Sequence, residues 1–300
     1  MMRMYHKPVL LDACLEGLAL KASGTYVDVT FGGGGHTKAI LDAIGSSGKV
    51  IAFDQDADAI ANVFEDDRLI FVHQNFSFLQ RFLRFHNIEK VDGILADLGV
   101  SSHQIDTPDR GFSTRFDGLL DMRMNSSEDK SAREVINTYG KEQLSEIFYQ
   151  YGELTNARKI AARIVDQRNH KPIDTTQELK AILAPLIPVK NEHKVLAQVF
   201  QALRIEVNQE LEALKSLLEQ STQVINSNGR LCVISYHSLE DRLVKRFIQH
   251  GCFDREPQKD EFGHFHKPFK KIGQLTLPSD IEVKNNKRAR SAKLRIAEKI

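Results

Sequence analysis

Apolar and polar positions along the first hundred residues follow a regular alternation. Short apolar runs rich in β-branched residues are separated by longer segments in which apolar and polar positions mix at helical spacing. The runs predict strands at 26–30, 49–54, 69–73 and 91–97, and the segments between them predict helices at 36–44, 57–65 and 76–87. This alternation is typical of a doubly wound, mostly parallel sheet with right-handed crossovers.

The pattern changes near residue 105. An irregular stretch rich in Asp, Arg and Gly comes first, and nearly everything from 131 to 223 then has helical periodicity. Helices are predicted at 131–138, 141–150, 155–168, 175–184 and about 193–225, followed by a strand at 229–235 and a helix at 239–250. We therefore expect an α/β fold with an inserted all-helical domain, the sheet domain being formed by 1–105 and 206–300 and the insert by 106–205.

Four consecutive glycines, Gly32 to Gly35, separate the first predicted strand from the first predicted helix. Glycine allows a sharp turn and a close approach of a ligand to the backbone, so this corner indicates a nucleotide site. Asp54 ends the next strand, where a ribose diol would lie. Such a corner with a later acid fits NAD, FAD and S-adenosylmethionine sites alike, but the spacing lacks the third glycine of dinucleotide folds, which disfavours NAD. A tight turn without a ligand is the structural alternative.

Further candidate site residues stand at or after the ends of predicted strands. Phe76 comes after the third strand, and Asp97 ends the fourth. Since the carboxyl ends of parallel strands meet at one edge of a sheet, we expect these residues to lie near Asp54. Asp97 can accept hydrogen bonds from an adenine or from a substrate amine. Asp121 stands two residues before Arg123, which is equally consistent with an internal salt bridge.

The segment Ser235–Arg242 opens a helix directly after the returning strand. Ser238, followed by two acidic residues, is the expected N-cap. An N-cap role accounts for Ser238 but gives no function to Tyr236 or His237. A serine hydrolase is disfavoured because the chain has no G-x-S-x-G turn. No metal site is expected, since His264 and His266 have no partner at ligand spacing.

Composition narrows the class of protein further. The formal net charge is +1, and no apolar stretch approaches the ~20 residues that a bilayer span needs. The N-terminus lacks the apolar core of a signal peptide and the three cysteines are far apart, so we expect a cytoplasmic protein without membrane contact. After residue 240 the chain is rich in Lys and Arg, interleaved with Phe262, Phe265 and Phe269. This pattern suits an RNA partner or a solvated basic surface.

Several long blocks carry a resemblance to a known family. They are His6-x-Pro8-Val9-Leu10-Leu11, Thr30 to His36, Asp97-Leu98-Gly99-Val100-Ser101-Ser102-x-Gln104, Leu120 to Met124, Phe200 to Asn208, Ser235-x-His237 to Arg242, and Arg288 to Ser291. In this order they resemble the bacterial cytosine-N4 methyltransferases of small-subunit ribosomal RNA, the MraW-type family. The resemblance covers essentially the whole chain.

The resemblance implies a class I, Rossmann-like methyltransferase with S-adenosylmethionine as cofactor and the small ribosomal subunit as partner. Its substrate would be the exocyclic N4 of a cytidine in the decoding region. The residues implied to contact the cofactor are Gly34, Gly35, His36, Asp54, Phe76, Asp97 and Gln104.

The chain departs from the acid-Pro-Pro-aromatic motif of DNA amino-methyltransferases, having Asp97-Leu98-Gly99-Val100 instead. The candidates for the catalytic group are Asp97 and Asp121, and a main-chain carbonyl near Leu98 is a further candidate acceptor. Two other functions stay open, a non-catalytic ribosome-assembly factor and a dinucleotide-dependent oxidoreductase. The sequence leaves the exact nucleotide, the assembly stage and a homodimeric state undetermined.

Overall fold

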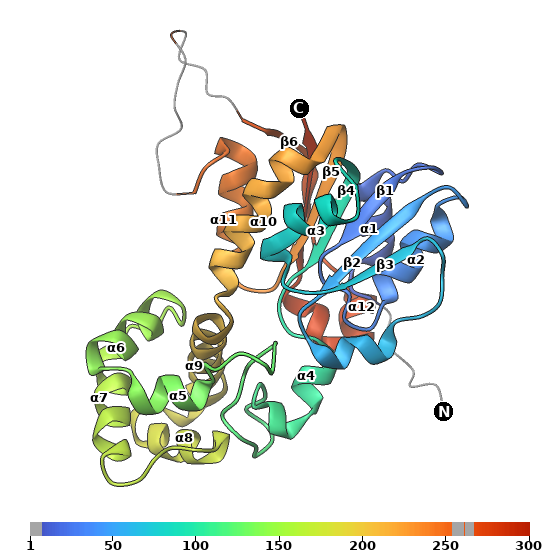
Figure 1. The fold of residues 1–300 in the computed structure, drawn as a ribbon. Coiled ribbons are helices and arrows are strands. Elements are labelled where there is room, and N and C mark those ends of the chain that lie inside the picture. Colours follow the sequence, from blue (N-terminus) through green and yellow to red (C-terminus); the bar gives the residue numbers. More distant parts are fainter. Residues whose placement is uncertain (1–7, 254–260, 262–266) are drawn as a thin grey trace. The chain divides into compact units, whose positions relative to one another are not determined.

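The computed structural model describes residues 8–253, 261 and 267–300. The chain divides into two compact units, one formed by the residues up to Gly99 together with those from Leu211 onward, and the other by Val100–Glu210 (Figure 1). Phe262, Phe265, His264 and His266 lie outside the described residues.

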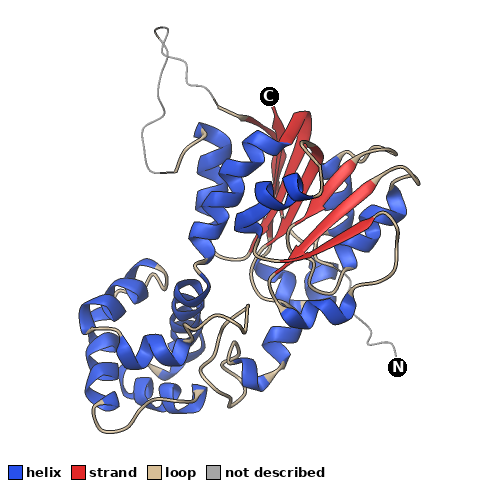
Figure 2. Cartoon of the chain, in the orientation of Figure 1, coloured by secondary structure: helices blue, strands red, loops and turns tan. Residues whose placement is uncertain are grey.

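The first unit is built on a seven-stranded sheet of order β3-β2-β1-β4-β5-β7-β6 (Figures 1 and 2). Strands β1 to β5 run parallel to one another, whereas β7, which lies between β5 and β6, is antiparallel to both. The strands are β1 (Thr25–Asp28), β2 (Lys49–Asp54), β3 (Leu69–His73), β4 (Val91–Asp97), β5 (Ile225–Ser235), β6 (Phe269–Thr276) and β7 (Lys293–Lys299). The predicted α/β class with a mostly parallel sheet is confirmed.

Helices cover both faces of this sheet, which makes a three-layer unit. On one face, β-strand side chains form a core with α3 (Leu79–Phe85), α10 (Glu210–Val224) and α11 (Ser238–His250). On the other, they pack against α1 (Leu11–Leu18) and α2 (Gly35–Ala43). A short helix, α12 (Asp280–Asn285), precedes β7. Both faces are apolar because parallel strands are buried on both sides.

The second unit is helical and has its own hydrophobic core, which includes Phe148, Ile160 and Leu203. Its helices are α4 (Ser102–Asp106), α5 (Ala132–Thr138), α6 (Lys141–Gln150), α7 (Ala157–Arg168), α8 (Thr176–Leu183) and α9 (Glu192–Asn208). Among the described residues, none of the helices in either unit has the length and apolar character needed to cross a membrane.

Two helix predictions need correction. The segment predicted as a helix at 57–65 forms a 3-10 helix at Ala57–Asn62. The long helix predicted at about 193–225 is two helices, because Gln209 adopts a left-handed conformation with φ of 50°. Asn208, the last residue of α9, bonds through its side chain to the main chain of Met122 and Met124. These bonds fix the end of α9 within the second unit.

The C-terminal region was predicted only as a basic surface, but it completes the sheet. Strands β6 and β7 carry many of its cations on the antiparallel edge. Phe269 begins β6 and is fully buried, with its ring centroid 6.3 Å from that of Phe247. Core packing thus takes up the ring of Phe269, which is not available to contact an RNA partner.

Candidate active site

Three carboxylates meet at the carboxyl edge of the parallel strands. Asp54, Asp28 and Asp97 are the last residues of β2, β1 and β4, which are neighbours in the sheet. Strand order reverses between β1 and β4, and ligands of such sheets bind at this switch point. The structure thus brings together Asp54, Asp97 and the glycine corner, as the sequence predicts. Asp28 was not among the predicted site residues, because in the sequence it is only one position of a predicted strand.

The glycine corner has a conformation that only glycine adopts without strain. Gly32 and Gly34 have φ of 51° and 74°. A Cβ at Gly34 would come within 2.9 Å of the Phe31 ring, and a Cβ at Gly35 would collide with Pro8. At Gly32 the space is open, with no atom nearer than 4.0 Å to a Cβ position. The corner is therefore tightly packed at its base and open at Gly32, where α2 begins shortly afterwards.

Asp54 is held by two main-chain amides. Its Oδ2 accepts from the Gly32 N–H at 2.7 Å, and its Oδ1 accepts from the Asp56 N–H at 2.9 Å. Burial raises the pKa of Asp54 to about 6, while these two amides favour the charged form. An ionised carboxylate has about four acceptor positions, so two remain available after these bonds. Asp54 is thus a fixed acceptor pair, mostly ionised at neutral pH.

Asp28 joins the strand to the helix that follows the corner. Its Oδ1 accepts from the Thr30 N–H at 3.0 Å, and its Oδ2 accepts from the Thr37 hydroxyl at 2.7 Å. The Thr30 hydroxyl in turn accepts from the Asp97 N–H at 2.7 Å. Sequence reasoning missed these supporting roles. The available signal was an acid at the end of an otherwise apolar strand with two nearby threonines.

Asp97 lies between a tyrosine and a histidine. The Tyr236 hydroxyl donates to Oδ1 at 2.7 Å, and Nδ1 of His36 lies 3.8 Å from Oδ2. His36 is buried, and its Nε2 lies 3.1 Å from the carbonyl oxygen of Val9. A carbonyl only accepts, so Nε2 carries the proton and Nδ1 faces Asp97. The predicted site residues Asp97 and His36 are therefore adjacent, and Tyr236 joins them.

Electrostatics set Asp97 apart from a surface acid. Burial raises its pKa to about 6, and the charge of Asp28 acts in the same direction. His36 and the Tyr236 hydroxyl oppose this shift. Burial and the charge of Asp97 raise the pKa of Tyr236 well above its usual value. The Tyr236 hydroxyl therefore stays protonated and donates a hydrogen bond to Asp97. Asp97 is a partly buried carboxylate that is mostly ionised at neutral pH and has one oxygen held by a neutral donor.

The start of α11 fixes the position of Tyr236. The N-cap is His237, and Ser238 is the first helical residue, so the predicted Ser238 cap is wrong by one position. Glu240 accepts at Oε2 from the main-chain N–H of Tyr236 at 2.8 Å and of His237 at 3.3 Å. This capping box holds the main chain of Tyr236 where its hydroxyl reaches Asp97. It explains both residues that the sequence had left without a role.

The remaining predicted residues have other surroundings. Phe76 is half-buried after β3, next to Asn75, which caps that turn by accepting from the Ser77 N–H at 2.8 Å. Gln104 belongs to the second unit and forms a capping box, its Oε1 accepting from the Ser101 N–H at 2.9 Å. The cofactor roles of Phe76 and Gln104 stay predictions.

Asp121 also belongs to the second unit and forms a bidentate ion pair with Arg123. The Nε and Nη2 atoms of Arg123 donate to the two carboxylate oxygens at 2.8 and 2.7 Å. Burial would raise the pKa of Asp121, but the hydrogen bonds and charge of Arg123 outweigh it and lower the pKa. This is the internal salt bridge that the sequence left open, and a catalytic role for Asp121 stays a prediction.

Comparison with known proteins gives matches over nearly the full length of the chain. Residues 3–300 match the MraW methylase family. Ribosomal RNA small subunit methyltransferase H of Flavobacterium johnsoniae is 58% identical over 296 residues, covering 99% of this chain and 98% of that protein. The protein of the same name from Bacteroides thetaiotaomicron is 52% identical, covering 98% and 97%. A solved rRNA methylase from Streptococcus thermophilus is 12% identical with a TM-score of 0.43, covering 99% of each chain. On its match over nearly its full length, the chain belongs to the MraW methylase family.

Proposed function

We propose that this protein transfers a methyl group from S-adenosylmethionine to the exocyclic N4 of a cytidine in the decoding region of small-subunit ribosomal RNA. The observation that carries the proposal is Asp97, a partly buried carboxylate of raised pKa that Tyr236 orients at the carboxyl edge of the sheet. Membership of a methylase family, and relatives named as small-subunit ribosomal RNA methyltransferases, support the reaction class and the kind of substrate.

The residues at the sheet edge fit the cofactor. The open space at Gly32 lies beside the fixed acceptors of Asp54, which suit a ribose diol. Main-chain amides at the start of α2 suit a carboxylate, because a helix N-terminus favours negative charge. Three acids at one edge favour a ligand that carries positive charge. When bound, S-adenosylmethionine supplies an electrophilic methyl group on a sulfonium.

Asp97 would act on the target amine. The lone pair of the cytosine amine is delocalised into the ring, which makes it a weak nucleophile. An ionised carboxylate oxygen that accepts from its N–H favours the pyramidal, nucleophilic form. Tyr236 occupies Oδ1, so Oδ2 faces the amine in this mechanism. After transfer the nitrogen loses a proton, and a carboxylate with pKa about 6 is a suitable acceptor near neutral pH.

In this proposal the two units would have separate functions, one in cofactor binding and methyl transfer and the other in RNA recognition. The sheet unit holds the cofactor and Asp97, whereas the helical unit, predicted as residues 106–205, would recognise RNA. A methyltransferase that acts on a structured base must take it out of the stack, and this requires surface beyond the cofactor site.

Two measurements test the proposal against its rivals. Small-subunit RNA from cells with and without the gene is digested and compared by mass spectrometry. We expect one cytidine to lose 14 mass units on deletion, the mass of one methylene. An unchanged RNA would favour a non-catalytic assembly factor. Calorimetry with S-adenosylmethionine and NAD separates the other rival, and tight binding of NAD alone would indicate an oxidoreductase.

A further inference from the structure

A wide bulge in β6 opens a hollow beside the antiparallel edge of the sheet. Ile272 of β6 pairs with Ile296 of β7, but the next registered pair is Thr276 with Leu294. Three residues of β6, including Gly273 with φ of 62°, therefore stand opposite a single residue of β7, Arg295. Bulges bend a strand away from its partner and leave ladder positions unpaired. The hollow is thus built into the register of the sheet.

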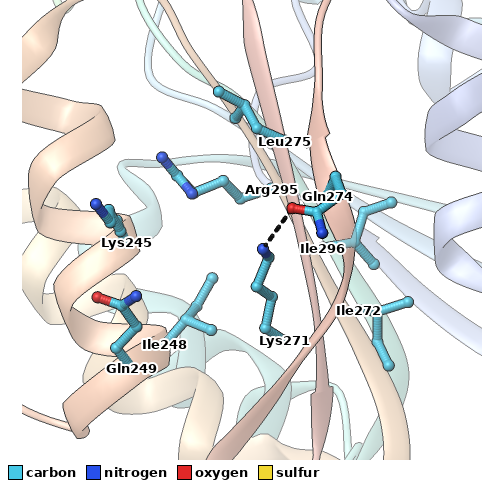
Figure 3. Close-up of a pocket in the computed structure, with 9 residues that line it drawn as sticks. All are labelled: Lys245, Ile248, Gln249, Lys271, Ile272, Gln274, Leu275, Arg295 and Ile296. Carbon is cyan, nitrogen blue, oxygen red and sulfur yellow. Dashed lines mark hydrogen bonds between the residues drawn. The ribbon is translucent and has the colours of Figure 1, made fainter.

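Nine residues from α11, β6 and β7 line this hollow, which is open to solvent and has a volume of about 60 Å³ (Figure 3). Three of them are cations from three different elements: Lys245 on α11, Lys271 on β6 and Arg295 on β7. None of the nine is acidic. The others are the amides Gln249 and Gln274 and the apolar residues Ile248, Ile272, Leu275 and Ile296.

The positive charge of the hollow is only partly neutralised. Within the described part of the chain, Lys245 has no ion-pair partner, and Lys271 donates to the neutral Oε1 of Gln274 at 3.1 Å. Arg295 donates from Nε to Oδ1 of Asp241 at 2.7 Å, but the same carboxylate also pairs with Lys293 at 3.5 Å. Arg295 and Lys293 thus share one carboxylate, and Lys245 and Lys271 add two further positive charges. An anion placed in the hollow would relieve their mutual repulsion.

We propose that this hollow binds a backbone phosphate of the RNA substrate, apart from the methyl-transfer site. This inference rests on the proposed function, which makes the substrate a polyanion. Cations that face a ligand over an apolar floor suit a nucleotide, whose phosphate and sugar present both kinds of surface. Figure 3 shows Lys245 on the helical wall and Lys271 on the strand wall.

The hollow lies within reach of the reaction edge. Arg295 is level with Val233 of β5, and Tyr236, which bonds Asp97, follows that strand. Strand spacing and rise place Lys271 roughly 15–20 Å from Asp97. A single RNA segment can therefore contact both places. The phosphate contact would hold the strand while its target base occupies the edge of the sheet.

The test compares two double variants of equal charge change. Lys245→Gln with Lys271→Gln removes two cations of the hollow. Lys49→Gln with Lys90→Gln is the matched control, because these exposed lysines lie at the starts of β2 and β4. Binding of small subunits is measured at several salt concentrations, together with the affinity for S-adenosylmethionine by calorimetry. Wild-type protein is assayed for methyl transfer in the same preparations.

For the hollow variant we expect binding to small subunits to be on the order of tenfold weaker near 0.1 M salt. The slope of log affinity against log salt concentration should be smaller by about 1–2, because fewer counterions are released when phosphate contacts are lost. Cofactor affinity stays at the wild-type value in both variants. If the hollow variant matches the control in affinity and slope, the hollow is no RNA site.

Two further arms identify the ligand. Loss of binding to intact subunits with unchanged binding to protein-free small-subunit RNA would assign the hollow to a ribosomal protein and overturn the proposal. Saturation of the hollow by inorganic phosphate at submillimolar concentration, with RNA binding undiminished, would assign it to a free anion and also overturn it. Failure of wild-type protein to methylate small subunits would instead refute the proposed function.

Discussion

Asp97 and Asp121 look alike in the sequence, since each acid follows an apolar run and each was a candidate for the catalytic group. In the folded chain their surroundings are opposite. Asp121 is neutralised by Arg123 through two charge-assisted hydrogen bonds, and its pKa is lowered. Asp97, whose side chain is equally exposed at 23%, instead receives a hydrogen bond from a neutral tyrosine, and burial raises its pKa to about 6.

This difference separates a structural acid from a reactive one. A carboxylate paired with arginine has its charge and its lone pairs already committed. A partly buried carboxylate whose second oxygen lies 3.8 Å from an imidazole nitrogen keeps acceptor capacity for a substrate. Perturbed carboxylates of this kind concentrate at functional sites.

The largest effect is expected from Asp97→Asn. Loss of the charged acceptor should lower the rate of methyl transfer on the order of a thousandfold, within the range of acid–base groups. Asp121→Asn should lower it less than about tenfold. The measurement is transfer of labelled methyl groups to small subunits at saturating cofactor. Equal losses in the two variants would mean that the ion pair of Asp121 is as important to catalysis as Asp97.

A second prediction concerns the cofactor rather than the reaction. Asp54→Ala removes two acceptor positions offered to the ribose, each worth roughly 1.5–3 kcal/mol for a charged acceptor. Affinity for S-adenosylmethionine should fall about a hundredfold or more. Asp58→Ala, an exposed neighbour, serves as the control. Near-normal affinity of the Asp54 variant in calorimetry would remove it from the ribose site.

A smaller effect is expected from Tyr236→Phe, which keeps the ring and removes the donor to Asp97. The turnover number should fall about tenfold, while the KM for S-adenosylmethionine stays constant. A transfer rate that needs ionised Asp97 declines below pH of about 6 in the wild type. Because the Tyr236 hydroxyl lowers the pKa of Asp97, its loss should move this decline to higher pH. Tyr149→Phe, at an exposed position, is the matched control. An unmoved pH profile would argue against a positioning role for Tyr236.

The smallest expected effect is on the free energy of unfolding. Replacement of Asp97 and of Asp121 should change it in opposite directions. The pKa of Asp97 is raised on folding, so its ionised form opposes folding above pH 6, and Asp97→Asn should stabilise the protein by about 1 kcal/mol at pH 7.5. The pKa of Asp121 is lowered, so its ion pair stabilises above the unfolded pKa and is lost as pH falls. Asp121→Asn should destabilise by about 1 kcal/mol. Denaturant unfolding of both variants measures the two signs, and a destabilised Asp97→Asn would contradict the desolvation argument.

Much of the fold was predictable because local pattern and tertiary structure agree. Strands β2, β3 and β4 have the predicted limits, since each is a short apolar run; β2 and β4 are mostly buried, and β3 is the half-buried edge strand. The two C-terminal strands were missed because lysine and arginine are interspersed among their apolar residues, and this charge suggested a surface. The break at Gln209 was missed because the conformation of a single residue decides it, and the helical periodicity continues on both sides.

The candidate site was predictable only in part, for a physical reason. Residues at strand ends converge because parallel strands share an edge, and this rule brings Asp54, Asp97 and the glycines together. Which residues hydrogen-bond to each site residue depends on contacts between segments that are distant in the sequence. Tyr236 stands 139 positions from Asp97, and neither local sequence predicts the bond between them. The contrast between Asp97 and Asp121 likewise appears only once burial and partners are fixed.

The most direct test of the central claim is a single-turnover reaction of wild-type protein and Asp97→Asn with small subunits and isotopically labelled S-adenosylmethionine, followed by nucleoside mass spectrometry. We predict that the wild type places one labelled methyl group on N4 of a cytidine in the decoding region, and that Asp97→Asn binds the cofactor but transfers the label on the order of a thousandfold more slowly. Label on a ring carbon or a ribose, or transfer by Asp97→Asn at the wild-type rate, would contradict the account.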